Sequence, residues 1–195
     1  MPLFKRERYE NWADEDLMTA ITQGKREAFE QIYERYFHPL CRFARTILQN
    51  DSEAEDVVQE VFMRLIDGNH GYDATRKFST WIFTLTANRA KNLVRNLGNR
   101  DRILNEMQPN SAIDYHDEDM ILQMDRTLLT QMMRDVLDSK SPKEKQLYAL
   151  RFERDLSIAE IAEILNIPIG SVKSGLYYLL KKIAREWKEK NYEHR

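Results

Sequence analysis

The sequence contains little of what marks secreted, membrane-spanning or collagen-like proteins. It has one cysteine in 195 residues, which excludes an internal disulfide framework and favours a reducing compartment. With only 6 glycines, 5 prolines and 10% aromatic residues, it is neither collagen-like nor of low complexity. No apolar run reaches the roughly 18 residues that a membrane span needs. Residues 1–12 lack the apolar core of a signal peptide, so we expect a cytoplasmic protein.

Residue patterns that support catalysis or hold cofactors are equally sparse. The four histidines, at positions 38, 70, 116 and 194, are far from any metal-ligand spacing. The sequence shows no nucleophile–base pair and no glycine-rich loop that could cradle a phosphate. We therefore predict a protein that is not an enzyme and that binds no metal ion or other cofactor.

Charge is unevenly distributed along the chain, although the formal net charge is only −2. Residues 76–102 carry seven Lys or Arg against one acid, and residues 173–190 carry six against two. Residues 51–60 hold five acids and residues 105–125 hold six, and neither stretch has a Lys or Arg. Two basic segments predict two surfaces that bind a polyanion; ordinary solvated helix faces are the alternative.

Apolar residues recur every three or four positions, which is the spacing of amphipathic helices. We expect helices over about 29–47, over 51–66 with Asp51 or Ser52 as N-cap, and over 78–97; Pro39 is expected to kink the first. The buried face of the first helix is predicted to comprise Phe29, Ile32, Tyr33, Tyr36, Leu40, Phe43, Ala44 and Ile47. No alternating strand pattern occurs, so we predict an all-α fold.

The helical pattern breaks near Asp67, at the turn-rich stretch GNHGYDATRK, and it vanishes between about residues 98 and 117, in an acidic stretch with turn-forming residues. Two small helical domains, residues 1–98 and 121–195, are therefore expected on either side of a flexible linker at 99–120. In the second domain, Ser141 with Glu144 and Ser157 with Glu160 have the spacing of capping boxes that begin helices.

The C-terminal part of the second domain is typical of a helix-turn-helix, with a turn at residues 166–168 and Pro168 suited to the first position of the second helix. On a wheel, one sector of roughly 100° holds Ile169, Val172, Leu176, Leu179, Leu180, Ile183 and Trp187. The outward side offers groups suited to phosphates and base edges in a major groove, namely Ser171, Lys173, Ser174, Tyr177, Tyr178, Lys181 and Arg185. A purely structural helical hairpin would show the same apolar sector.

The predicted helix 78–97 also has a polar side, which comprises Trp81, Thr84, Asn88, Lys91, Asn92 and Arg95. An aromatic ring beside amides and cations suits a surface that stacks and holds unpaired bases. The alternative is that Trp81 covers a neighbouring helix.

Four segments, in this order and around an acidic linker, resemble the extracytoplasmic-function (ECF) sigma factors of bacterial RNA polymerase. They are DLMTAITQGKREAFEQIYERYF, DSEAEDVVQEVFMRL, FSTWIFTLTANRAKNLVR and LSIAEIAEILNIPIGSVKSGL. The resemblance covers about residues 14–97 and 125–187. It implies that residues 1–98 are sigma domain two and residues 121–195 are sigma domain four, and that the protein directs transcription initiation.

The resemblance also implies residue roles. The helix at 51–64 would bind the coiled coil of the largest polymerase subunit, through Asp56, Gln59, Glu60, Met63 and Arg64. The helix of Trp81 and Asn88, with Tyr72 in the loop before it, would open the minus-ten region and hold a flipped non-template base. The helix from Pro168 would read the minus-thirty-five element.

Partners implied by the resemblance are core RNA polymerase, promoter DNA both as duplex and as melted strand, and an anti-sigma factor. One position departs from the family pattern, because Gly175 stands where an arginine is usual. The absence of that arginine would remove a bidentate partner for guanine. Two other functions fit the helical pattern: a helix-turn-helix repressor or activator that acts without polymerase, and a helical module that binds proteins only.

Overall fold

The computed structural model describes residues 9–67, 71–97 and 137–192, and every element within these ranges is helical, which confirms the all-α fold. The chain divides into two compact units, Met1–Arg102 and Ile103–Arg195. The predicted linker at 99–120 and the helical pattern at 121–136 lie outside the described residues.

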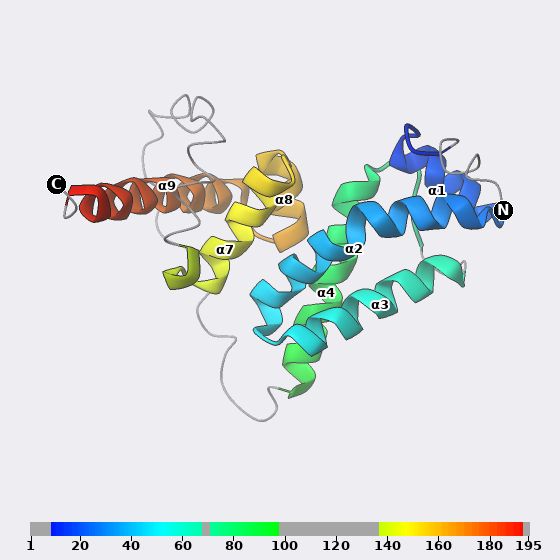
Figure 1. The fold of residues 1–195 in the computed structure, drawn as a ribbon, viewed down its shortest axis with the longest axis horizontal. Coiled ribbons are helices and arrows are strands. Elements are labelled where there is room, and N and C mark those ends of the chain that lie inside the picture. Colours follow the sequence, from blue (N-terminus) through cyan, green and yellow to red (C-terminus); the bar gives the residue numbers. More distant parts are fainter. Residues whose placement is uncertain (1–8, 68–70, 98–136, 193–195) are drawn as a thin grey trace. The chain divides into compact units, whose positions relative to one another are not determined.

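In the part of the first unit that the structure describes, residues 9–67 and 71–97, there are four helices, shown in blue to green in Figure 1. They are α1 (Asp14–Thr22), α2 (Arg26–Leu48), α3 (Asp51–Ile66) and α4 (Phe78–Leu97). α2 contacts each of the other three helices, and α3 and α4 also contact each other. The exposed sides of α3 and α4 therefore lie on a common scaffold.

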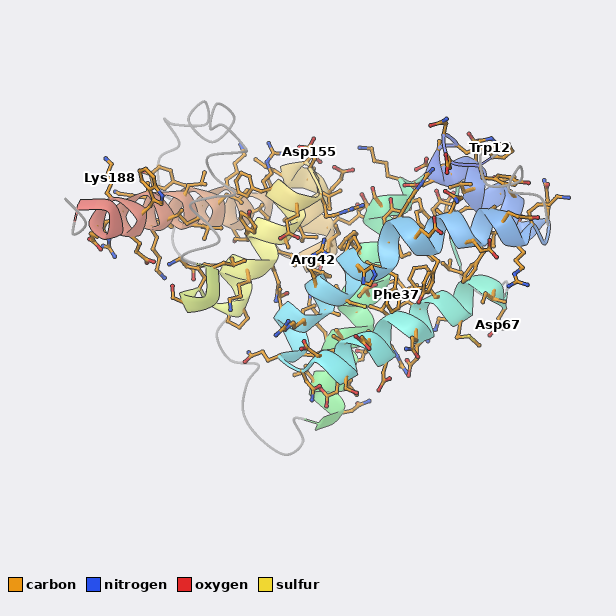
Figure 2. The ribbon with its side chains drawn as sticks, in the orientation of Figure 1. Trp12, Phe37, Arg42, Asp67, Asp155 and Lys188 are labelled. Carbon is orange, nitrogen blue, oxygen red and sulfur yellow. The ribbon has the colours of Figure 1, made fainter. Side chains whose placement is uncertain are left out.

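Aromatic rings fill much of the space between these helices. Phe43 of α2 meets Phe83 of α4 with ring centroids 5.3 Å apart, and Tyr36 meets Phe78 at 5.2 Å. The predicted burial of Tyr33 is wrong, because its ring is 38% exposed and stacks on Phe37 at 4.7 Å. Figure 2 labels Phe37 on α2, where it also faces Phe62 of α3.

The boundaries of α3 and α4 follow the prediction, whereas α2 begins at Arg26 rather than near residue 29 and α1 was not among the expected helices. α3 ends at Ile66 and α4 spans Phe78–Leu97, as predicted. The N-cap of α3 is Asn50 rather than Asp51 or Ser52, since the Asn50 side chain accepts a hydrogen bond of 3.2 Å from the amide of Glu53. Three consecutive cap-forming residues left the sequence ambiguous at this point.

The start of α4 is fixed from another helix. The carboxylate of Glu15, in the first turn of α1, accepts a hydrogen bond of 2.9 Å from the backbone amide of Phe78. The first amides of a helix have no partner within it, and a negative charge there is also favourable to the helix dipole. Glu15 thus stabilises the first turn of α4.

Over its described residues, 137–192, the second unit has three α-helices: α7 (Pro142–Tyr148), α8 (Ile158–Leu165) and α9 (Ile169–Tyr192). A short 3₁₀ turn, η2 (Leu137–Ser139), precedes α7, and a π-helix, η3 (Ala149–Glu153), follows it. Both predicted capping boxes are confirmed, with Ser141 at α7 and Ser157 at α8. α7 and α8 pack against α9 (Figure 1).

α8 and α9 form the predicted helix-turn-helix. Asn166 ends α8 in a left-handed conformation with φ of 56°, and α9 begins at Ile169, one residue after the predicted start. The apolar sector of α9 is confirmed at Val172, Leu176, Leu179 and Ile183, each 0% exposed. Ile169 is an error, because it is 51% exposed. It is the first residue of α9, ahead of the turn at which this sector enters the core.

Candidate functional site

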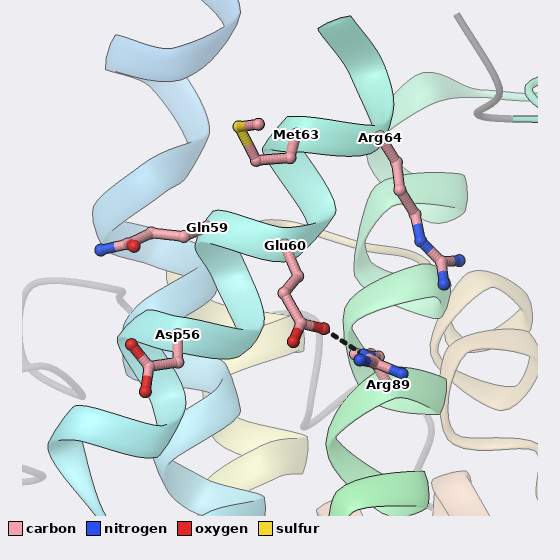
Figure 3. Close-up of a pocket in the computed structure, with 6 residues that line it drawn as sticks. All are labelled: Asp56, Gln59, Glu60, Met63, Arg64 and Arg89. Atoms are coloured by element: carbon pink, nitrogen blue, oxygen red, sulfur yellow. Dashed lines mark hydrogen bonds and ion pairs between the residues drawn. The ribbon is translucent and has the colours of Figure 1, made fainter. Parts of the chain in front are cut away.

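The exposed face of α3 forms an open pocket of about 520 Å³ against α4. Figure 3 shows that its lining includes every residue predicted to bind polymerase: Asp56, Gln59, Glu60, Met63 and Arg64. The sixth lining residue is Arg89 of α4. The structure thus brings the five predicted residues together at one place.

The composition of this pocket is typical of a surface that contacts another protein. Its side chains are exposed, and the apolar Met63 is 57% exposed beside two carboxylates and two guanidinium groups. The opposite side of α3 enters the core, where Val58 is 0% and Phe62 is 3% exposed. Methionine and arginine are both more common at protein interfaces than on the rest of a protein surface.

Arg89 is the residue of this pocket that sequence reasoning missed. Its guanidinium donates a hydrogen bond to the carboxylate of Glu60 across the two helices, and this bond raises the pKa of Arg89. Residues 51–60 of α3 are acidic with no Lys or Arg, and α4 belongs to the basic segment 76–102, so complementary charge was the available signal. The wheel of α4 did not show which helix lies beside that arginine.

Trp81 of α4 is buried, although the sequence placed it on the polar side of that helix. Its ring is only 8% exposed and packs against Tyr72 at 5.1 Å and Phe78 at 5.7 Å between centroids. The Tyr72 hydroxyl donates to the backbone carbonyl of Arg76 at 2.8 Å. Burial, and then the charge of Glu15 and other nearby carboxylates, raises the pKa of Tyr72 to about 12, so its hydroxyl stays protonated.

The remaining predicted residues of α4 differ in exposure. Asn88, Asn92 and Arg95 are exposed, and Arg95 donates to the side-chain oxygen of Asn92 at 2.8 Å. Thr84 and Lys91 are half-buried, and burial lowers the pKa of Lys91. The exposed three form a polar strip that continues beyond the buried Trp81.

The predicted outward stripe of α9 is exposed most toward its middle. Tyr178 is 42% exposed, and Lys181 and Arg185 are exposed, whereas the four other predicted residues are half-buried: Ser171, Lys173, Ser174 and Tyr177. The Lys181 ammonium lies 5.9 Å from the centre of the Tyr177 ring, within reach of a cation–π interaction. Hydroxyl groups, aromatic rings and cations thus share one side of α9, the second helix of the helix-turn-helix.

Gly175 lies at the border between this stripe and the apolar side of α9, and it is half-buried. A Cβ atom at Gly175 would come 2.6 Å from Cδ1 of Leu147 in α7. Gly175 therefore has a packing role against a neighbouring helix, and the expected effect of the missing arginine on guanine contact stays a prediction. The glycine allows α9 and α7 to approach closely.

Two further observations concern membranes and metals. None of the helices in the described ranges is long and apolar enough to cross a bilayer. Over the same ranges, no three His, Cys, Asp or Glu side chains are grouped to hold a metal ion.

Comparison with known families and proteins shows what this chain is similar to. Residues 32–100 match the family model for Sigma-70 region 2, and residues 131–183 match that for Sigma-70 region 4. The chain is 28% identical over 163 residues to the ECF RNA polymerase sigma factor SigW of Bacillus subtilis, with 80% of this chain and 87% of that protein aligned. It is 29% identical over 175 residues to the ECF RNA polymerase sigma-E factor of Haemophilus influenzae, with 86% and 92% aligned.

The fold also resembles a solved structure, that of CnrH in complex with the cytosolic domain of CnrY. The TM-score is 0.58 at 18% identity, covering 91% of this chain and 99% of the other. The two matched regions together span most of the described residues, in the order expected from the sequence, and they set aside a repressor or a module that binds proteins only. The chain belongs to the sigma-70 family and is an ECF sigma factor, a subunit that binds core RNA polymerase and promoter DNA and directs promoter-specific initiation of transcription.

Proposed function

We propose that three surfaces divide the work of this sigma factor. The pocket on α3 binds core polymerase through Asp56, Gln59, Glu60, Met63 and Arg64. α4 and the loop that precedes it open the minus-ten region through Tyr72, Trp81, Thr84, Asn88, Lys91, Asn92 and Arg95. The outward side of α9 reads the minus-thirty-five element through Ser171, Lys173, Ser174, Tyr177, Tyr178, Lys181 and Arg185.

The observation that carries this proposal is the shared pocket on α3. Five residues chosen by resemblance line one open surface, while the opposite side of the same helix is committed to the core. Asp56 and Glu60 lie one helical turn apart and both are exposed, so they can bind basic side chains of a partner helix.

Reversal of both charges tests the role of the pocket. The double variant Asp56→Lys/Glu60→Lys should lose association with core polymerase while keeping the helical circular dichroism of the parent. Glu55→Lys is the matched control, because Glu55 is exposed on the same helix but does not line the pocket. Wild-type capture of core polymerase by the folded double variant would remove α3 from the proposal.

The minus-ten role is best tested at Asn88, which is exposed and can be truncated without loss of core packing. Asn88→Ala should relax base preference at one position of the opened region, because an amide that pairs with a base edge is lost. Permanganate reactivity of thymines on promoters that differ at that position reports the preference. An unchanged preference would exclude Asn88 from base contact.

The minus-thirty-five role predicts a division along α9. Ser174, near the N-terminal end, is expected to contact a base edge, and Lys181, two turns later, a phosphate. Sequences selected from a random pool should change at one position for Ser174→Ala. For Lys181→Ala they should stay the same while binding weakens throughout. The reverse outcome would overturn this orientation of α9 in the groove.

The proposal has further parts. The protein is a non-catalytic subunit without a cofactor and acts in the cytoplasm. Its functional domains are residues 1–98 and 121–195, joined by a linker at 99–120; the two matched regions, 32–100 and 131–183, support this division without fixing its limits. An anti-sigma factor regulates it, an arrangement supported by the fold's likeness to CnrH, whose structure includes the cytosolic domain of CnrY.

A further inference from the structure

The ion pair between Glu60 and Arg89 joins the two helices to which the proposed function assigns different partners. Glu60 belongs to the α3 pocket, and Arg89 follows Asn88 on α4. Figure 3 shows the Arg89 side chain extending from α4 to the Glu60 carboxylate, while Gln59 lies on the same turn of α3 as Glu60 and Asp56 lies one turn away. This contact is therefore placed where polymerase binding and strand opening could influence each other.

The ion pair between Glu60 and Arg89 is weak enough for another cation to replace Arg89. Its side chains are 50% and 41% exposed, and ion pairs of such exposure contribute little to stability. A cationic side chain of polymerase that approached this pocket would meet two carboxylates, those of Asp56 and Glu60. Because the interface would exclude water, the attraction of this cation to the two carboxylates would become stronger. Such a cation competes directly with Arg89 for Glu60.

Arg89 stands at the border of the polar strip of α4. One residue corresponds to a rotation of about 100° around a helix, so Arg89 lies beside Asn88 on the side that turns toward α3. While it is held by Glu60, its charge is compensated. A guanidinium that leaves this carboxylate is well suited to contact a phosphate oxygen, because its planar donors match that geometry.

We propose that a cationic side chain of core polymerase replaces Arg89 at Glu60, and that the released Arg89 then contacts a backbone phosphate of the opened promoter strand. The inference rests on the proposed role of α3 in polymerase binding and goes beyond it, because it makes DNA affinity depend on polymerase binding. Coupling of this kind is reciprocal: DNA that engages Arg89 also leaves Glu60 available to polymerase.

The first test uses the full chain without polymerase and a short single-stranded DNA of mixed sequence. Glu60→Gln should release Arg89, tighten binding several-fold and steepen the dependence of log affinity on log salt by about one unit, the signature of one added phosphate contact. The double variant Glu60→Gln/Arg89→Gln should return to the parental salt slope. Glu55→Gln removes the same charge from α3 outside the pocket and should leave the slope unchanged.

The second test uses holoenzyme assembled at core polymerase concentrations that saturate every variant. Arg89→Gln should now reduce the salt slope for DNA by about one unit. Glu60→Gln should leave the slope at the parental value. In the parental holoenzyme, polymerase already occupies the Glu60 carboxylate and Arg89 is already released.

Two results would overturn the exchange. One is the same change in salt slope from Glu60→Gln and Glu55→Gln, which would mean that only the overall charge matters. The other is an unchanged slope for Arg89→Gln in holoenzyme. Either result leaves the α3 proposal intact, since that proposal is decided separately by capture of core polymerase with Asp56→Lys/Glu60→Lys.

Discussion

The ammonium group of Lys140 is hydrogen-bonded to the carboxylate of Glu186, and the lysine side chain is 0% exposed. Lys140 directly precedes the capping box of α7, whereas Glu186 lies in the last third of α9. The hydroxyl of Ser139 accepts a second hydrogen bond from the ammonium at 3.2 Å. The start of α7 is thus tied to the far part of the helix proposed to read DNA.

Loss of the Glu186 carboxylate should destabilise the second unit markedly. Glu186→Ala leaves a buried ammonium without its counter-charge, which is expected to reduce the free energy of unfolding by about 3 kcal/mol. Lys140→Met/Glu186→Leu should lose much less, because no charge remains buried. Urea unfolding of the full chain with hydrogen exchange of α9 measures both. A smaller loss from the single variant than from the double would contradict the argument.

Gly175 should resist replacement for steric reasons. In Gly175→Ala the new methyl group would lie 2.6 Å from Cδ1 of Leu147, a side chain only 1% exposed. Overpacking costs about 1–3 kcal/mol, against about 1 kcal/mol gained in helix propensity, so we expect a net loss of up to about 2 kcal/mol.

The same substitution in a Leu147→Val background provides the control. Valine has no Cδ atom, so Gly175→Ala should then be neutral or stabilising. Thermal unfolding of the parent, the two single variants and the double variant gives the coupling between the two positions. Additive effects would show that Leu147 is not the obstacle.

Trp81 should contribute to stability as well as to promoter opening. Because its ring is 8% exposed, Trp81→Ala is expected to lower the free energy of unfolding of the first unit by about 3–5 kcal/mol. Trp12→Ala, at a tryptophan that is 39% exposed, should cost clearly less. Equal losses in urea unfolding would contradict the packing seen around Trp81. Opening assays on Trp81→Ala therefore need a temperature at which the variant is folded.

The pKa of Glu144 predicts acid sensitivity at α7. Burial acts to raise this pKa, but hydrogen bonds from Ser141 and the nearby charge of Lys182 outweigh it, so the pKa is lowered. A lowered pKa contributes stability above the unfolded-state value of about 4.3, and this contribution is lost as the pH falls through the folded-state pKa. Glu144→Gln should flatten the acid limb of a pH series of urea unfolding. Glu189→Gln, at an exposed ion pair, should not.

Elements governed by local rules could be predicted from the sequence. The long helices follow from apolar spacing, and Ser141 and Ser157 follow from capping chemistry, because all the determinants lie within a few residues. The five residues of the α3 pocket were implied by the resemblance to ECF sigma factors rather than by helix geometry, and they line one surface because consecutive turns of one helix share a face.

Features that depend on contacts between distant segments could not be predicted. Trp81 is covered by Tyr72 from a loop, and Gly175 faces Leu147 of another helix. A helical wheel shows which side of a helix is polar, but not what lies beside it. The same limit hid the pairing of Arg89 with Glu60.

The hydrogen bond between Glu15 and the amide of Phe78 spans 63 residues of sequence. It gives α1, which supplies none of the proposed contacts with polymerase or DNA, a share in positioning the first turn of α4. A genetic selection for altered promoter opening should therefore return substitutions at Glu15. Such substitutions would act by changing how the first turn of α4 is positioned relative to the DNA. Suppressors of them would be found in the Tyr72 loop rather than in the promoter.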